Sequence, residues 1–250
     1  MSSRGDKKRK NESIEEGENR KRRSVRLIPT WPRDTREIWI YREPQKSKHC
    51  GLHCLNNFMQ SPHAFKIGLL RELAKSLDQT ERDLYLNGRH GNNQLLQIYL
   101  SEESGNASQN GNFSLETIRR ALQMSGFDLT AIKMDDVDKI FAQEVGFIVH
   151  SDLHWIAYRK IKGKWWNLDS VLNEPVVVPE GQLVETLSLE GSILFELSGP
   201  PDKMNSLVQH AGVMPPIHDF DQSVWFTESE LLRRCRDPPG KKREALFSGL

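Results

Sequence analysis

The sequence predicts an α+β fold in which a helical part packs against an antiparallel sheet. Helical patterns, with apolar residues recurring every three or four positions, come first along the chain. After Gly126 the pattern changes to short apolar or alternating runs that are typical of strands. With 250 residues, the chain is long enough for one domain of ordinary size plus tails.

The composition favours an intracellular protein. Charged residues make up 28% of the chain, yet the net charge is only +1, so no overall field points to nucleic acid or to a membrane surface. No apolar run approaches the length of a membrane span. Three cysteines and no signal-peptide pattern at the N-terminus are typical of a reducing compartment, which we expect to be the nucleus or the cytoplasm.

Residues 1–28 are expected to form a disordered basic tail. They contain almost no large apolar residues and carry two basic clusters, Lys7–Lys10 and Arg20–Arg23. Such a segment cannot bury enough surface to offset the entropy lost on ordering. The two clusters resemble a bipartite nuclear import signal, which makes an import receptor a candidate partner. Nonspecific phosphate binding and a merely solubilising role would explain the same charges.

Three helices are expected. The first begins at or near Cys50, because the apolar residues after it fall on one helical face. The second covers residues 66–77, and the third runs from a Ser114 cap to residue 124, with Gly126 just beyond its end. Between them, residues 87–112 are rich in Gly, Asn and Ser and predict a loop, with a short helix candidate at 95–100.

The strand candidates follow a short extended entry at Glu37–Tyr41. They are Leu129–Lys133, Gly146–His150, His154–Arg159, Trp165–Leu168 and Ile193–Leu197.

Two of these strands form a predicted hairpin around Ile161–Gly163. With a loop of two or four residues, the numbers of facing residues sum to about 323 or 325. His154 and Asp169 then share one face, with Cβ atoms about 5 to 8 Å apart. A bulge or a three-residue loop would break this relation. A carboxylate beside an imidazole is how a general base is held in its tautomer and orientation.

Cys50 is the candidate nucleophile. The first turn of a helix offers unsatisfied N–H groups and the positive end of the dipole, and both favour a thiolate. Gly51 leaves the backbone uncrowded for a substrate carbonyl. The order Cys50, His154, Asp169 along the chain is that of papain-like enzymes. Gln45, five residues before Cys50, places a side-chain amide donor near the space in front of the sulfur.

Two alternatives remain for the cysteines. Cys50 and Cys54 could be small core residues one helical turn apart. They could also bind zinc together with a histidine pair such as His150 and His154. The distance of almost a hundred residues between the two pairs argues mildly against zinc. Cys235 lies in an Arg-rich piece, and we assign it no function.

The motifs together resemble the Josephin family of papain-like deubiquitinases. They are Gln45, then Cys-x-x-His-Cys-Leu-Asn-Asn starting at Cys50, then His154-Trp155, and then Trp166–Ser170. The resemblance implies a papain-like cysteine protease (Josephin) fold and a catalytic domain at residues 36–200. It leaves residues 201–250 as a mostly irregular C-terminal tail, with many Pro and Gly, a short capped helix candidate at Thr227–Leu232 and a basic stretch at 241–243.

The resemblance also implies roles for single residues. Cys50 matches the nucleophile, His154 the general base and Gln45 the donor to the oxyanion. Asp169 stands where the better-known family member has an Asn. We assign His53 and Cys54 to packing and support of the helix.

The implied activity is hydrolysis of isopeptide bonds at the ubiquitin C-terminus, without a cofactor. Ubiquitin or polyubiquitin conjugates would be the partners. The alternative is a ubiquitin-binding module with little catalytic activity.

Overall fold

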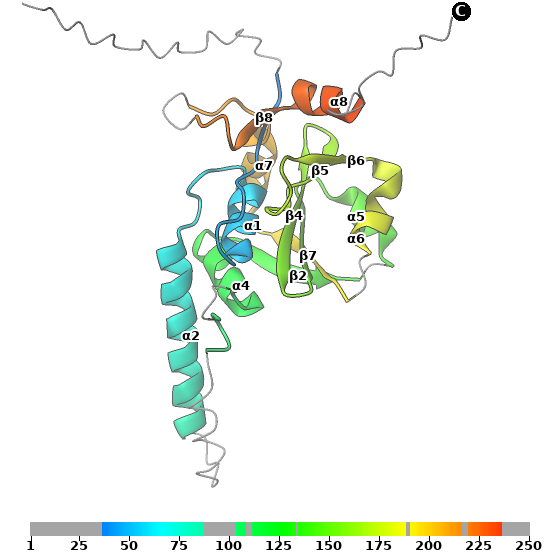
Figure 1. Ribbon diagram of the computed structural model, residues 1–250. Coiled ribbons are helices and arrows are strands. Elements are labelled where there is room, and N and C mark those ends of the chain that lie inside the picture. The colour runs from blue at the N-terminus through cyan, green and yellow to red at the C-terminus, as the bar shows by residue number, and fades with distance from the viewer. Residues whose placement is uncertain are drawn as a thin grey trace, which may run out of the picture. The chain divides into compact units, whose positions relative to one another are not determined.

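A computed structural model describes residues 37–87, 104–108, 112–133, 135–188, 191–216 and 220–236, which belong to one compact unit (Figure 1). The expected N-terminal tail, the helix candidate at 95–100 and the basic stretch at 241–243 lie outside the described residues and stay predictions.

The centre of this unit is an antiparallel sheet of six strands in the order β2-β7-β3-β4-β5-β6. The strands are β2 (Asp128–Ile132), β3 (Gly146–Ser151), β4 (His154–Ile161), β5 (Lys164–Asn167), β6 (Val176–Val178) and β7 (Ile193–Ser198). The five strand candidates after Gly126 are confirmed. β6 was not predicted, because three residues are too few to show a period.

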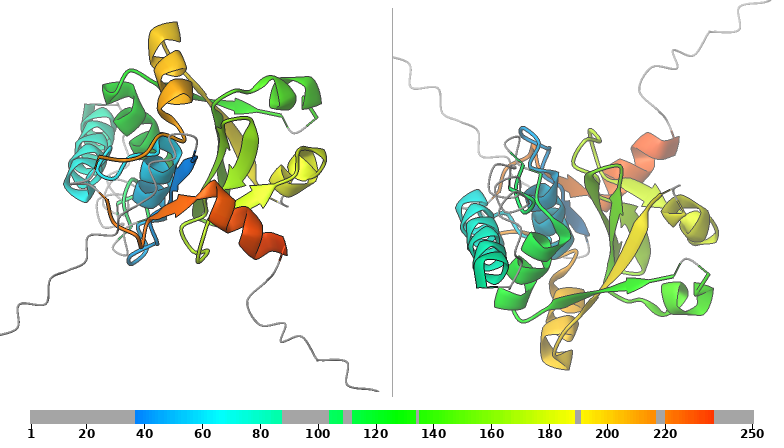
Figure 2. Two further views of the ribbon diagram at one scale, coloured as in Figure 1. Left: turned by 90° about the horizontal axis from the view of Figure 1, so that it is seen from above. Right: turned by 90° about the horizontal axis from the view of Figure 1, so that it is seen from below.

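Helices cover both faces of the sheet (Figures 1 and 2). One face carries α1 (Cys50–Met59), α2 (Ile67–Asn87), α4 (Leu115–Met124) and α7 (Pro201–His210). The other face carries α5 (Val137–Ala142), the 3-10 turn η1 (Glu180–Gln182) and α6 (Leu183–Leu187). The predicted helical part on an antiparallel sheet is therefore confirmed. The second helical layer was not predicted, since five or six residues make less than two turns.

The core follows from strict alternation along the central strands. On β4, Trp155 and Ala157 belong to the larger core that includes α1 and α4, whereas Ile156 and Tyr158 belong to the smaller core under α5 and α6. Neighbouring side chains of a strand point to opposite faces, so β4 is apolar on both sides.

The helix α1 is nearly enclosed and lies against β4. Gly51 is buried, and a Cβ atom there would lie 2.8 Å from Ile118 Cδ1 and 3.4 Å from Trp155 Cδ1. The missing side chain thus allows α4 and the sheet to approach α1. Our expectation that Gly51 leaves room for a substrate is replaced by a packing role.

The other two predicted helices are confirmed with one change of length. Ser114 caps α4 by accepting the N–H of Thr117, and Gly126 has a φ of 82° just past its end. α2 runs ten residues beyond the predicted residue 77. Its second half is exposed, with Leu84 69% accessible, so no apolar stripe marks it. None of the helices in the described ranges is long and apolar enough to cross a membrane.

Residues after 200 contain more regular structure than the expected irregular tail. Besides α7 they form β8 (Trp225–Thr227) and α8 (Glu228–Arg236). Pro201 is compatible with α7 because it occupies the first turn, where its missing N–H costs nothing. The capped helix candidate is confirmed: Thr227 Oγ1 accepts the N–H of Glu230 at 3.4 Å.

The strand β8 pairs with β1 (Trp39–Tyr41) in a separate two-stranded sheet. Trp39, Tyr41 and Trp225 form a third buried cluster there. The segment before Cys50 and the end of the described chain therefore hold each other in place.

Candidate active site

The β4–β5 hairpin brings His154 and Asp169 together. Its turn has two residues, Lys162 and Gly163, both with positive φ, and Ile161 faces Lys164. Facing residues therefore sum to 325, as one of the two predicted registers requires. Asp169 lies just past β5, and its Oδ1 atom is 2.7 Å from Nε2 of His154. The predicted pairing of imidazole and carboxylate is present.

The Asp169 carboxylate is fixed by its own turn. It is 8% exposed, and Oδ1 also accepts the N–H of Val171 at 3.1 Å. The N–H of Asp169 in turn donates to Oδ1 of Asn167 at 2.9 Å. Such local side-chain bonds are typical of Asx turns, and here they hold the carboxylate towards the imidazole.

Cys50 is the first residue of α1 and is 2% exposed. Its Sγ atom lies 3.8 Å from the carbonyl oxygen of Leu153, and the thiol also hydrogen-bonds to His154. A second tight turn, Asp152–Leu153, joins β3 to β4 and has positive φ at both residues. This turn places His154 at the start of β4, opposite the start of α1. The predicted nucleophile, base and orienting group thus meet.

The electrostatics of the three residues favour a charged histidine. The hydrogen bond to Asp169, followed by the one to Cys50, raises the pKa of His154 to about 10, although burial opposes the charge. Since Nε2 faces Asp169, Nδ1 is the ring nitrogen left for the thiol. An imidazolium between a carboxylate and a sulfur atom can stabilise a thiolate at neutral pH.

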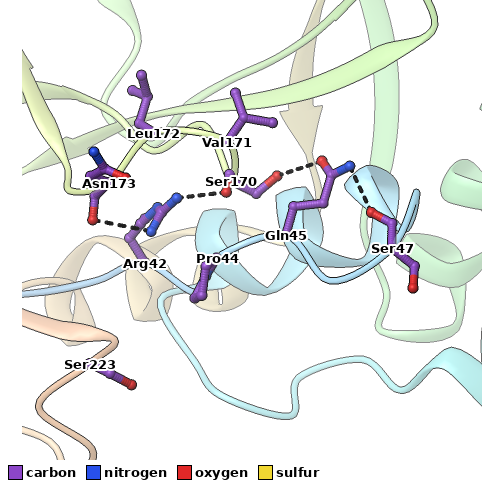
Figure 3. A pocket seen from close by; sticks show the side chains of 9 residues that line it. All are labelled: Arg42, Pro44, Gln45, Ser47, Ser170, Val171, Leu172, Asn173 and Ser223. Atoms are coloured by element: carbon purple, nitrogen blue, oxygen red, sulfur yellow. Dashed lines mark hydrogen bonds between the residues drawn. The ribbon is translucent and has the colours of Figure 1, made fainter.

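Gln45 lies in the loop before α1, beside the turn that follows Asp169 (Figure 3). Its backbone N–H donates to the Ser170 carbonyl at 2.8 Å, and its Oε1 accepts the Ser170 hydroxyl at 3.2 Å. Its Nε2 donates to the Ser47 carbonyl at 2.9 Å. Gln45 therefore borders the site, and its role as oxyanion donor stays a prediction.

Gln45 also lines a polar pocket of about 430 Å³. The other lining residues are Arg42, Pro44, Ser47, Ser170, Val171, Leu172, Asn173 and Ser223.

A partly buried hydrogen-bond network around Glu43 holds the Gln45 loop on α1. The carboxylate accepts bonds from the Tyr41 hydroxyl at 2.5 Å, His53 Nδ1 at 2.7 Å and Asn56 Nδ2 at 3.0 Å. The His53 Nε2 atom then accepts the N–H of Lys46 at 3.0 Å. Burial disfavours the charge of Glu43, but the bonds from His53, Tyr41 and Asn56 outweigh it and lower its pKa.

Sequence reasoning missed Glu43. It assigned His53 to support of the helix, which agrees with this network but understates it. The only available signal was the spacing of His53 and Asn56 by three residues, which puts two polar groups on one side of the helix.

Asn57, one residue further, connects both flanks of the site. Its Oδ1 accepts the Glu43 N–H at 2.7 Å, and its Nδ2 donates to the Leu168 carbonyl at 2.9 Å. The first of these contacts fixes the loop that carries Gln45, and the second fixes the end of the strand that carries Asp169.

The zinc alternative has no geometric support in the described part of the chain. No group of three or more His, Cys, Asp or Glu side chains there is arranged to hold a metal ion. Cys54 is buried, which raises its pKa well above the ordinary value, and His150 packs its ring 4.2 Å from that of Trp155. Both residues therefore belong to the packing around the site.

A cysteine at a helix start that faces a histidine on an antiparallel sheet defines the papain-like class of fold. Within that class, a family model described as Josephin matches residues 45–192. This match covers more than half of the chain, so the chain belongs to the Josephin family.

Several curated proteins are similar to the chain. "Ataxin-3 homolog" of Arabidopsis thaliana is 36% identical over 141 residues, which cover 54% of this chain and 49% of the relative. "Putative ataxin-3 homolog" of Oryza sativa subsp. japonica is 32% identical over 171 residues, 64% of this chain and 50% of the relative. "Ataxin-3" of Rattus norvegicus is 29% identical over 219 residues, 80% of this chain and 61% of the relative. The chain thus spans about half the length of the first two relatives.

Proposed function

We propose that the protein is a thiol-dependent deubiquitinase that hydrolyses the isopeptide bond between the ubiquitin C-terminus and a lysine. The observation that carries the proposal is the contact of Cys50, His154 and Asp169 in a chain of the Josephin family. A nucleophile, a base and an orienting group are the parts that thiol acyl transfer needs.

In the proposed reaction the Cys50 thiolate attacks the carbonyl carbon of the terminal glycine. The negative charge passes to the carbonyl oxygen, where the backbone N–H of Cys50 and the Gln45 amide stabilise it. A primary amide has two N–H donors, and the bond to Ser47 uses one of them. Collapse of the tetrahedral intermediate breaks the C–N bond, and the lysine amine leaves with the proton of His154. His154 then takes a proton from water, whose oxygen attacks the thioester carbon, so that ubiquitin is released and the thiolate and imidazolium are restored.

The test is a ubiquitin derivative that carries a thiol-reactive group at its C-terminus. We expect a covalent adduct with the wild type, mapped to Cys50, and none with Cys50→Ala. The matched control is Cys235→Ala, which removes the exposed thiol and should leave the adduct unchanged.

Two results would overturn the proposal in different ways. Noncovalent ubiquitin binding without an adduct would favour a recognition module with little activity. If the protein forms no adduct and shows no binding, ubiquitin is not its partner.

A further inference from the structure

Arg42, which follows β1, holds the turn that carries Asp169. Its Nε donates to the Asp169 carbonyl at 3.2 Å, its Nη2 to the Ser170 carbonyl at 2.6 Å and its Nη1 to the Asn173 carbonyl at 3.3 Å. Figure 3 shows the guanidinium between Ser170 and Asn173. The arginine is 3% exposed. One planar fork therefore spans the turn after β5 and anchors it to the segment before α1.

The hydrogen-bond acceptors of the buried Arg42 guanidinium are unusual for a buried cation. All three hydrogen bonds go to neutral carbonyl oxygens, although a cation is costly to bury unless a negative charge compensates it. Burial lowers the pKa of Arg42, and the charge of Asp169 acts in the opposite direction. The Asp169 carboxylate is thus the negative charge that partly compensates Arg42 through space. The same carboxylate lies 2.7 Å from Nε2 of His154.

We propose that Arg42 is a positioning residue for the reactive pair, acting on Cys50 and His154 through Asp169 in two separable ways. The guanidinium fork keeps the Asp169 turn at the distance that orients the imidazole. The positive charge of the guanidinium acts on the Asp169 carboxylate and, beyond it, on the reactive pair. The inference rests on the proposed function only in using the same site.

The two effects predict different consequences. Loss of the fork disorders the geometry and lowers turnover. Loss of the charge disfavours a negative charge nearby, so alkylation of Cys50, which needs the thiolate, begins at higher pH. A merely structural role would reduce turnover in both Arg42 variants and leave their Cys50 alkylation profiles alike at low pH.

The other titratable groups around the pair are not substituted in the test. Asp169 and His150 act electrostatically with His154, and Asp169 and Cys50 act on Cys54. His49, at the cap of α1, is influenced by Arg71 and His53 and has a lowered pKa, chiefly through burial. Since these groups are the same in both Arg42 variants, a difference between the two variants can be assigned to the charge at position 42.

The experiment measures the rate at which iodoacetamide alkylates Cys50 between about pH 4 and pH 11, with peptide mapping by mass spectrometry. This small neutral reagent needs no ubiquitin. Cys235→Ser serves as the background, because it removes the exposed thiol. The variants are Arg42→Gln, which loses fork and charge, and Arg42→Lys, which keeps the charge but loses the fork. Arg120→Gln removes an exposed charge on α4 as the matched control.

In Arg42→Gln we expect the lower midpoint of the alkylation profile, where the thiolate of Cys50 forms, to lie about 0.3 to 1 pH unit above that of Arg42→Lys, because the two variants differ only in charge at that pH. In Arg120→Gln the lower midpoint should stay within about 0.2 unit of the parent. Only the lower midpoint is compared between the Arg42 variants, because a lysine at position 42 would lose its own proton near the upper one. Turnover of a ubiquitin substrate should fall about tenfold or more in both Arg42 variants, because the orientation of the base is lost, and not in Arg120→Gln.

A folded Arg42→Gln variant whose lower midpoint does not lie above that of Arg42→Lys would overturn the inference. If circular dichroism shows that Arg42→Gln does not fold, full turnover of Arg42→Lys would overturn it instead. A wild type that shows the two-step alkylation profile but no reaction with the ubiquitin probe would refute the proposed function alone.

Discussion

The Glu43 carboxylate and the His53 imidazole lie 2.7 Å apart beneath the loop that carries Gln45. Because Nδ1 of His53 donates to Glu43, Nε2 is left as the acceptor for the N–H of Lys46. The carboxylate thus sets the histidine tautomer, and the tautomer holds the loop. The Glu43–His53 contact, although it lies outside the reacting groups, therefore helps to fix the position of Gln45, the predicted oxyanion donor.

Replacing Glu43 should destabilise the protein. In Glu43→Ala the Tyr41 hydroxyl, His53 Nδ1 and the Asn56 amide lose a shared, partly buried acceptor. We expect the free energy of unfolding to fall by about 1 to 3 kcal/mol, measured by urea denaturation. Glu144→Ala, at an exposed ion pair with Lys160, should change it by less than about 1 kcal/mol. Equal losses in the two variants would show that the network adds nothing to stability.

Loss of the Gln45 amide should slow turnover but leave the thiol of Cys50 reactive. We expect kcat of Gln45→Ala to fall about a hundredfold to a thousandfold, since one oxyanion donor is worth about 3 to 4 kcal/mol in the transition state. Alkylation of Cys50 by iodoacetamide should stay near the wild-type rate, because that reaction forms no oxyanion. Gln79→Ala, on the exposed part of α2, is the control. Wild-type kcat in Gln45→Ala would remove the residue from the mechanism.

The charge of Asp169 should set the alkaline limit of activity. The pKa of His154 is raised to about 10, chiefly by the hydrogen bond with Asp169, so the imidazolium of the wild type persists until about pH 10. Asp169→Asn keeps an oxygen acceptor but removes the charge, and the pKa of His154 should then fall towards about 6.5. We expect the alkaline limb of kcat/KM to move to lower pH by about one unit or more. An unmoved limb would contradict the assignment.

The same pair should make stability depend on pH. A histidine whose pKa is higher in the folded state binds its proton more tightly there. It therefore stabilises the fold fully below about pH 6.5 and progressively less as the pH rises through about 10. The difference in unfolding free energy between wild type and Asp169→Asn should be largest near pH 6 and shrink towards pH 10. A difference that grows with pH would have the wrong sign.

The aromatic cluster between β1 and β8 should be part of the folded domain. Trp225 is 7% exposed, and its ring centroid lies 5.0 Å from that of Tyr41. We expect Trp225→Ala to cost about 3 to 5 kcal/mol in thermal or urea unfolding, as for other buried aromatic residues. Leu84→Ala, at a 69% exposed position, should cost less than about 1 kcal/mol. If the free energy of unfolding of Trp225→Ala is close to that of the wild type, the segment around β8 is not part of the folded domain.

Local patterns were enough for much of the fold. Ser114 and Gly126 marked the ends of α4, because caps satisfy backbone groups within a few residues. The two-residue turn at Lys162–Gly163 set the register of the β4–β5 hairpin, and with it the pairing of His154 and Asp169. These are interactions of short sequence range, which the order of residues specifies directly.

Other features depended on contacts between distant segments. The pairing of β1 with β8, the second helical layer and the packing of Gly51 against Ile118 join segments whose sequences carry no mutual signal. α5, α6 and β6 are too short to show a period of their own.

The candidate site divides in the same way. Its residue types and their order along the chain, Cys50, His154 and Asp169, could be predicted because motif spacing and strand register are local properties. The residues that hold these three side chains in place could not be predicted from the sequence. Glu43 beneath His53 and Arg42 across the Asp169 turn bridge 10 and 127 residues respectively. Only the tertiary fold brings a partly buried carboxylate and a buried guanidinium to these groups, because burial and hydrogen-bond partners are set by packing rather than by the neighbours of a residue in the sequence.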